Sequence, residues 1–146
     1  MAHLYGKKAK APQNMPGDGR AVMIDDTYSV AANPTDGDVV NFLLPAGLRL
    51  GMLDIRSDDL DTGTPEIVFS VGYRAATTGS SLSANATYFA AAGQTTAQGG
   101  GTLHCSFEPI KFEEDVYVTI TIATNSATFA AGDICMIAVG AAEGVK

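Results

Sequence analysis

The sequence predicts an all-β protein: a single-domain antiparallel β-sandwich or jelly roll with an extended N-terminal arm. Small and β-branched residues are abundant and charged residues make up only 17% of the chain, which disfavours a helical bundle. Short runs that alternate between apolar and polar residues recur along the chain, and turn sequences separate them. The length of 146 residues is that of one ordinary domain.

Residues 1–19 are expected to form the arm, and residues 20–146 the sandwich domain. The arm contains two prolines and three glycines and has no hydrophobic period, so it is a poor long helix or central strand. Residues 1–20 carry a net charge of +3 and residues 21–146 a net charge of −10. The acidic body disfavours nucleic acid and anionic membranes as partners. The basic arm either contacts an acidic partner surface or is a solvated terminus.

The strands are justified in chain order by alternation and by the turns between them. Residues 33–37 combine proline, aspartate and glycine in a turn, and Pro45 closes the strand that follows. The clearest alternation places every second residue from Ile67 to Tyr73, and from Val116 to Ile122, on one buried face. The predicted strands are 21–30, 38–44, 47–56, 66–74, 101–112, 115–124 and 133–142.

Residues 77–101 break this pattern. The run SANATYFAAA at 83–92 does not alternate, and a glycine-rich stretch follows it. We expect a long loop over 77–101 with one helical turn around residues 87–91. Tyr88 and Phe89 in this loop would either contact a partner or cap the end of the sandwich.

The acidic run DDLD at 58–61 is the strongest candidate for a metal site. Calcium takes six to eight oxygen ligands, and Asp58, Asp59 and Asp61 supply some of them. Gly63 is not at the position that glycine takes in a calcium loop, however, and no glutamate stands at the twelfth position of such a loop. The alternative is a turn in which aspartate side chains accept nearby backbone N–H groups. We therefore predict no metal site, and calcium binding remains the alternative.

No other residues form a convincing chemical site. His104 and Cys105 are neighbours, and adjacent strand residues point to opposite faces, so they are poor joint ligands. No nucleotide-binding or hydrolase motif is present, and no cofactor is predicted. Cys105 and Cys135 lack CxxC spacing and a secretory signal, which favours free thiols in a protein made in a reducing cytoplasm. A disulfide between them stays possible if their strands are neighbours.

Three runs carry a resemblance to a known class of proteins: GDVVNFLLPAGLRLGMLDIRSDDLDTGTPEIVFSVGY, ANATYFAAAGQTTAQGGG and VYVTITIATNSATFAAGDICMIAVGAA. Over about residues 37–142 they resemble small virion proteins of tailed bacteriophages, above all capsid decoration (cement) proteins. The resemblance implies a jelly-roll-like domain, made in the host bacterial cytoplasm and bound to the outer surface of the head. It implies that the chain stabilises contacts between major capsid protein subunits, as a homo-oligomer (a dimer or trimer).

Capsid decoration proteins have no catalytic residues that could be assigned to this sequence, so the chain is not expected to be an enzyme. The candidate partner contacts are Leu4, Tyr5, Lys7, Lys8, Lys10, Tyr88 and Phe89. A receptor- or carbohydrate-binding β-sandwich of a phage tail or another virion structure is the alternative. Such sites usually present exposed aromatic residues, and this chain has five tyrosines but no tryptophan. A depolymerase or lysin fragment is weaker still, because no acid–base pair is evident.

Overall fold

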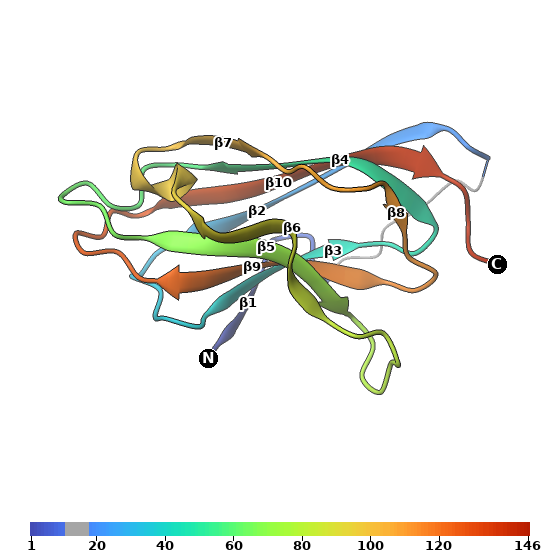
Figure 1. Ribbon diagram of the computed structural model, residues 1–146, viewed down its shortest axis with the longest axis horizontal. Coiled ribbons are helices and arrows are strands. Elements are labelled where there is room, and N and C mark those ends of the chain that lie inside the picture. The colour runs from blue at the N-terminus through green and yellow to red at the C-terminus, as the bar shows by residue number, and fades with distance from the viewer. Residues whose placement is uncertain (11–17) are drawn as a thin grey trace.

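Two β-sheets lie face to face in the computed structural model, which describes residues 1–10 and 18–146 (Figure 1). The strands are β1 (His3–Tyr5), β2 (Ala21–Val30), β3 (Val39–Leu44), β4 (Leu48–Ser57), β5 (Val68–Ala75), β6 (Asn85–Gln94), β7 (Gly101–His104), β8 (Ile110–Lys111), β9 (Val116–Thr124) and β10 (Gly132–Ala142). Within the described ranges the helical content is one 3₁₀ turn, η1 (Thr96–Gln98). The predicted all-β sandwich is confirmed.

The first sheet has the order β1-β3-β9-β5-β6, and the second has the order β2-β10-β4-β7 with β8 also beside β4. Strands far apart in the sequence pair in nested fashion: β2 with β10, β3 with β9, β4 with β7, and β5 with β6. All four pairs are antiparallel, whereas β1 joins β3 in parallel. The chain therefore runs as one long hairpin wrapped into two layers.

The core lies between the two sheets, where the alternation of the sequence predicts it. In β9 every second residue from Val116 to Ile122 is at most 1% exposed, and in the β5 region Ile67, Phe69 and Val71 are equally buried. The second sheet contributes apolar residues such as Leu53 and Met136. Burying one face of each strand against the other sheet supplies most of the stabilisation of such a sandwich.

The prediction of a loop over 77–101 is wrong for its central part. Asn85–Gln94 forms β6, the edge strand of the first sheet, and the helical turn lies later, in η1. The strand is not evident from the sequence, because its pairing with β5 is irregular on both sides of the Val71–Ala90 pair. Extra residues in one strand shift its inward positions, so the apolar residues no longer recur at every second place.

Two further expectations differ from the structure. The single strand predicted over 101–112 is divided into β7 and β8, each of which pairs with a different part of β4. Residues 1–10 do not extend away from the domain as a free arm, because β1 adds a strand to the first sheet. The rest of the predicted arm, at 11–17, lies outside the described residues.

Candidate interaction surfaces

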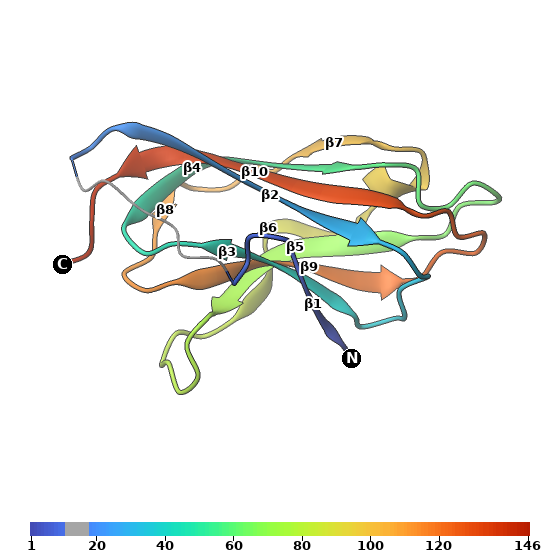
Figure 2. The ribbon, with the colours of Figure 1, turned by 180° about the vertical axis from the view of Figure 1, so that it is seen from behind.

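Residues 1–10 form a strap that joins the edges of both sheets (Figure 2). At its start, Ala2 donates its N–H to Asp38 Oδ1 (2.8 Å) and accepts the N–H of Val39 (2.8 Å). After β1, Gly6 donates to the carbonyl of Asn41 in β3 at 2.9 Å, and Lys7 donates to the carbonyl of Thr27 in β2 at 3.0 Å. The strap therefore closes the side of the sandwich at which β3 and β2 are the edge strands.

Asn41 is the polar centre of this attachment, and it is completely buried. Its Nδ2 donates to the carbonyls of Leu4 (2.7 Å) and Val39 (3.0 Å), while its Oδ1 accepts from Arg74 Nε (2.8 Å). A buried amide is tolerated when its donors and acceptor are satisfied. Asn41 thus connects the strap to β3 and, through Arg74, to β5.

Tyr5 and Tyr117 cover Arg74 on the outer side of the first sheet. The guanidinium lies 4.6 Å from the centre of the Tyr117 ring, and the two tyrosine rings meet edge to face at 5.5 Å. The ammonium of Lys10 lies 4.8 Å from the Tyr5 ring centre. Cation–π contacts and aromatic pairs of this kind each add about 0.5–1.5 kcal/mol. The predicted contact residues Leu4, Tyr5 and Lys10 are therefore engaged within their own chain.

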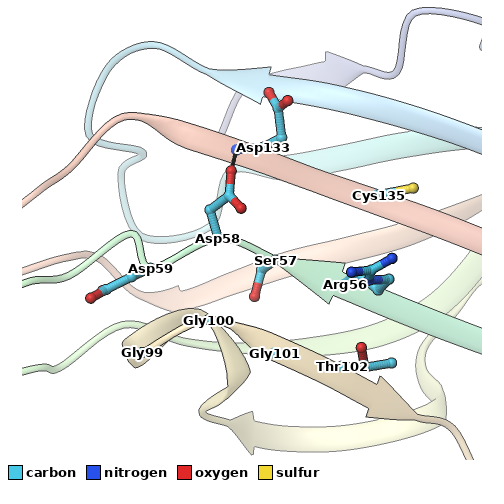
Figure 3. Close-up of a pocket in the computed structure, with 10 residues that line it drawn as sticks. All are labelled: Arg56, Ser57, Asp58, Asp59, Gly99, Gly100, Gly101, Thr102, Asp133 and Cys135. Atoms are coloured by element: carbon cyan, nitrogen blue, oxygen red, sulfur yellow. Dashed lines mark hydrogen bonds between the residues drawn. The ribbon is translucent and has the colours of Figure 1, made fainter.

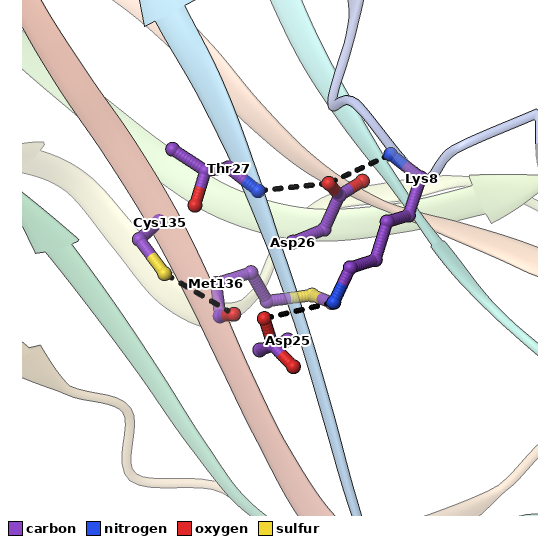
Figure 4. Close-up of polar contacts among 6 residues, drawn as sticks. All are labelled: Lys8, Asp25, Asp26, Thr27, Cys135 and Met136. Carbon is purple, nitrogen blue, oxygen red and sulfur yellow. Dashed lines mark hydrogen bonds and ion pairs between the residues drawn. The ribbon is translucent and has the colours of Figure 1, made fainter.

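Lys8 attaches the end of the strap to two consecutive aspartates of β2 (Figure 4). Its backbone N–H donates to Asp26 Oδ1 at 2.8 Å, and its ammonium pairs with the exposed Asp25 at 2.9 Å. Asp26 is only 1% exposed, and its Oδ2 finds no hydrogen-bond partner among the described residues. Gly6 passes directly over this carboxylate, where a Cβ would collide with Oδ2. Lys7 is exposed, so it remains accessible to a partner.

Tyr88 and Phe89 lie in β6 within an aromatic cluster rather than on a loop. Phe89 is 1% exposed and meets Phe107 edge to face at 4.8 Å, and Tyr73 lies within 5.4 Å of the Tyr88 ring centre. Tyr88 is partly exposed, and its hydroxyl donates to the carbonyl of Glu108 (3.3 Å). Phe89 is therefore a core residue in this structure, whereas part of Tyr88 can be reached from outside.

The acidic run DDLD fixes turns by accepting backbone N–H groups. The buried carboxylate of Asp61 accepts four of them, from Glu66 (2.8 Å), Ile67 (3.2 Å), Ala127 (3.0 Å) and Thr128 (2.7 Å). Burial alone would raise the pKa of Asp61, but these bonds outweigh it and lower the pKa to about 2. Asp61 thus ties the 61–67 turn to the β9–β10 connection.

A pocket of about 460 Å³ lies beside this run, where β4, β10 and the triglycine stretch 99–101 meet (Figure 3). Asp58 accepts the N–H of Asp133 at 2.8 Å, and Asp59 accepts the N–H of Asp61 at 3.1 Å. The carboxylates of Asp58, Asp59 and Asp133 point in different directions rather than toward one centre (Figure 3). Across the described residues no group of three or more acidic, histidine or cysteine side chains is arranged to hold a metal. The interpretation as a turn has the direct support of these bonds.

His104 and the two cysteines do not form a joint site. His104 Nδ1 lies 2.8 Å from Asp54 Oδ1 on the outer face of the second sheet. Cys105 and Cys135 are free thiols. Burial, and secondly the charge of Asp54, raises the pKa of Cys105 to about 12, so its reactive thiolate form is scarce at neutral pH.

The residues that organise the two outer faces were not predicted from the sequence. Asn41 of β3 and Arg74 of β5 lie on the outer face of the first sheet. A polar residue at such a position predicts only that its side chain points outward, not what it contacts. On the second sheet, Met23 and Met52 are 65% and 61% exposed. A methionine at an outward strand position could have been noticed, but its neighbours on other strands depend on register.

Two chains from phage capsids are similar to this protein. A chain in the capsid of Ralstonia phage GP4 matches with a TM-score of 0.73 and 26% identity, over 99% of this chain and 100% of that chain. A chain of the cyanophage Pam1 capsid asymmetric unit matches with a TM-score of 0.68 and 27% identity, over 91% and 94% of the two chains. No protein-family model matches the sequence, and no curated protein sequence matches it either.

The fold and these likenesses support a bacteriophage capsid-related protein with a structural role in the virion. Capsid chains are structural rather than enzymatic proteins, which agrees with the expectation that this chain is not an enzyme. Among residues 1–10 and 18–146, no helix has the length and apolar character that a membrane span requires.

Proposed function

We propose that this chain is a capsid decoration (cement) protein. It binds the outer surface of a phage head as a homo-oligomer and stabilises contacts between major capsid protein subunits. The observation that carries the proposal is the likeness to a chain in a phage capsid over 99% of this chain and 100% of that one. Because the likeness includes both ends of the matched chain, it concerns the whole architecture rather than one shared motif.

The nested strand pairing supports the jelly-roll part of the proposal. Apart from β1 and β8, eight strands lie four to a sheet and pair from the outermost (β2 with β10) to the innermost (β5 with β6). Jelly rolls combine eight strands in two sheets in this way, and the architecture is frequent in capsid proteins. Such a sandwich is a rigid body that can present its faces and edges to a shell.

The way in which the strap connects the two sheets supports a role in which the protein withstands mechanical load. Hydrogen bonds from residues 2–8 reach β3 and β2, so the two sheets are connected at their edges as well as through the core. Exposed edges are also sites at which another chain can add a strand. Many weak contacts made at once on a repetitive shell give strong attachment through avidity.

Binding to heads tests the proposal. Purified chain is mixed with expanded heads that lack it and with unexpanded shells, and co-sedimentation and the thermal rupture temperature of the heads are measured. Saturable binding to the expanded heads and a higher rupture temperature are expected. Absence of binding to heads of the phage that encodes the chain would refute a decoration role. A glycan-array signal that disappears in Tyr88→Ala would favour the receptor-binding alternative instead.

A further inference from the structure

The register of the second sheet places three apolar side chains in one row on its outer face. Val139 of β10 lies opposite Met23 of β2 on one side and opposite Met52 of β4 on the other. We call these three residues the methionine row. Met23 and Met52 are 65% and 61% exposed, and the partly exposed Ile137 continues the patch along β10.

This row differs from ordinary scattered surface hydrophobics. Met1 and Val145, the other large apolar residues with high exposure in the described chain, lie at its two ends, whereas Met23 and Met52 lie within paired strands. Contiguous exposed apolar residues mark contact surfaces more often than single ones do. Methionine is adaptable and is favoured where side chains of two molecules must fit together.

Charged residues flank the methionine row on both of its sides. On one side of the row, Ile137 of β10 lies opposite Asp54 of β4 and opposite Asp25 of β2. On the other side of the row, Arg49 lies opposite Ala141. Arg49 gives two of its N–H groups to Glu143, and a guanidinium has five. One side of the row therefore carries Asp54, beside His104, and Asp25, which pairs with Lys8. The other side carries Arg49, which pairs with Glu143.

A two-fold axis along the methionine row makes this face complementary to itself. Rotation about such an axis places the row of one copy over the row of the other, and it exchanges the two flanks. Arg49 of each copy then faces Asp54 of its partner. An axis along the strands would instead place Asp54 of one copy over Asp25 of the other. Arg49 has N–H groups left after its two bonds to Glu143. Opposite charges that meet across an interface fix its orientation, so the contact of Arg49 with Asp54 favours the first arrangement.

We propose that the outer face of β2, β10 and β4 is a homodimer interface, with a two-fold axis along the methionine row. The occupant of the face is a second copy of this chain. The proposal specifies the homo-oligomer of the proposed function and rests on that part of it. The dimer forms in free solution, so capsid binding and dimerisation can fail independently of each other.

The size of the face sets the expected strength. Three strands of ten or eleven residues cover about 14 Å by 33 Å, or roughly 460 Å² of projected area per copy. Both copies together therefore bury about 1,000 Å², at the lower end of specific interfaces. Two sheets can pack face to face over such an area in the same way as the layers of a sandwich. We expect a reversible dimer with a Kd on the order of micromolar.

Sedimentation velocity over a range of concentrations tests the dimer directly. The wild-type chain is expected to shift from monomer to dimer as its concentration rises through about 1–100 µM. Met52→Gln is expected to weaken dimerisation about tenfold. Val145→Gln removes another exposed apolar side chain and serves as the matched control. A wild-type chain that stays monomeric at the highest concentration, or that forms a trimer, would overturn the proposal. So would equal effects of the two substitutions.

Charge exchange tests the orientation of the axis. Arg49→Glu and Asp54→Arg should each weaken the dimer, because each places like charges across the interface. The double variant should restore dimerisation, since the exchanged charges again face each other. Neither the internal pair of Arg49 with Glu143 nor that of Asp54 with His104 is restored in the double variant. Restored dimerisation therefore reports the contact between copies, and a double variant as weak as the single ones contradicts this orientation.

Crosslinking checks the position of the axis without relying on affinity. A cysteine at position 52 faces its own counterpart in the proposed dimer. In a Cys105→Ser, Cys135→Ser background, Met52→Cys should give a covalent dimer with a short bismaleimide. Ala123→Cys, an exposed position on the outer face of the first sheet, should not. Efficient crosslinking at position 123 with none at position 52 would place the interface on the other sheet.

Discussion

The outer faces of the two sheets have opposite characters. On the first sheet the outward side chains of Asn41, Ser70 and Thr119 are polar, yet they are at most 5% exposed. On the second sheet the outward side chains of Met23 and Met52 are apolar and more than half exposed. Part of the first face is covered by the chain's own strap, which contacts Asn41 and Tyr117, and by the start of β6, which lies against Gly72. The second face has no such cover within the described residues.

The difference shows that the residue types on the outer face of a sheet depend on what covers that face. A face covered by its own chain needs small residues for close approach and polar groups that the covering backbone can satisfy. Gly72 illustrates this requirement, because a Cβ there would collide with Asn85 and Ala86 of β6. A face that keeps large apolar residues in water gains stability only when another surface covers it.

Gly72→Ala should have the largest effect, because it breaks the covered face. The added methyl group would force the β6 backbone away from β5, and overpacking against backbone destabilises by about 3 kcal/mol. Urea unfolding followed by circular dichroism measures the change. Gly99→Ala is the control, since its Cβ would meet no atom within 4 Å. Equal stability of the two variants would contradict the close approach of β6.

Asn41→Ala should have the next largest effect. It removes the partner of the Leu4 carbonyl and of Arg74 Nε, and lost bonds of a buried amide correspond to about 2 kcal/mol. The strap should also become easier to cleave with trypsin after Lys7 and Lys8. Asn125→Ala, at an exposed position, should change neither quantity. Unchanged proteolysis in Asn41→Ala would mean that β1 is held by other contacts.

Acid should destabilise the protein through Asp61, which is buried in the connection between β4 of the second sheet and β5 of the first. Its pKa falls from 3.8 in the unfolded chain to about 2 in the folded one. A group with a lowered folded pKa contributes stability above its unfolded pKa, and this contribution disappears as pH falls toward the folded pKa. The wild-type chain should therefore lose stability between pH 4 and pH 2. In Asp61→Asn this part of the pH dependence should be absent, whereas the exposed control Glu108→Gln should retain it.

Met23→Gln should have the smallest effect on folding. The side chain is 65% exposed, and substitutions at such positions usually change the free energy of unfolding by less than about 0.5 kcal/mol. Thermal unfolding at low protein concentration, where the chain is monomeric, measures it. A loss comparable to that of Asn41→Ala would show that the methionine row supports the monomer rather than an interface.

Prediction from the sequence succeeded where one face of a strand is buried and the pairing is regular. The stretches 66–74 and 115–124 alternate because their inward residues meet the other sheet, and both are strands as predicted, to within two residues. It failed at 85–94, because irregular pairing displaces Phe89 from the period of an ideal strand. The pairing of residues 3–5 with β3 could not be predicted, because a three-residue strand leaves almost no pattern in the sequence.

The sequence by itself determined the fold class, most strand positions and the absence of familiar catalytic motifs, because these depend on local order along the chain. The tertiary structure alone decided that the strap joins both sheets, and that Asp61 serves four N–H groups from two separate segments. It also decided that Met23 and Met52 lie in one row. Such contacts depend on register between strands that are far apart in the chain, and one residue of slippage would turn each side chain to the opposite face.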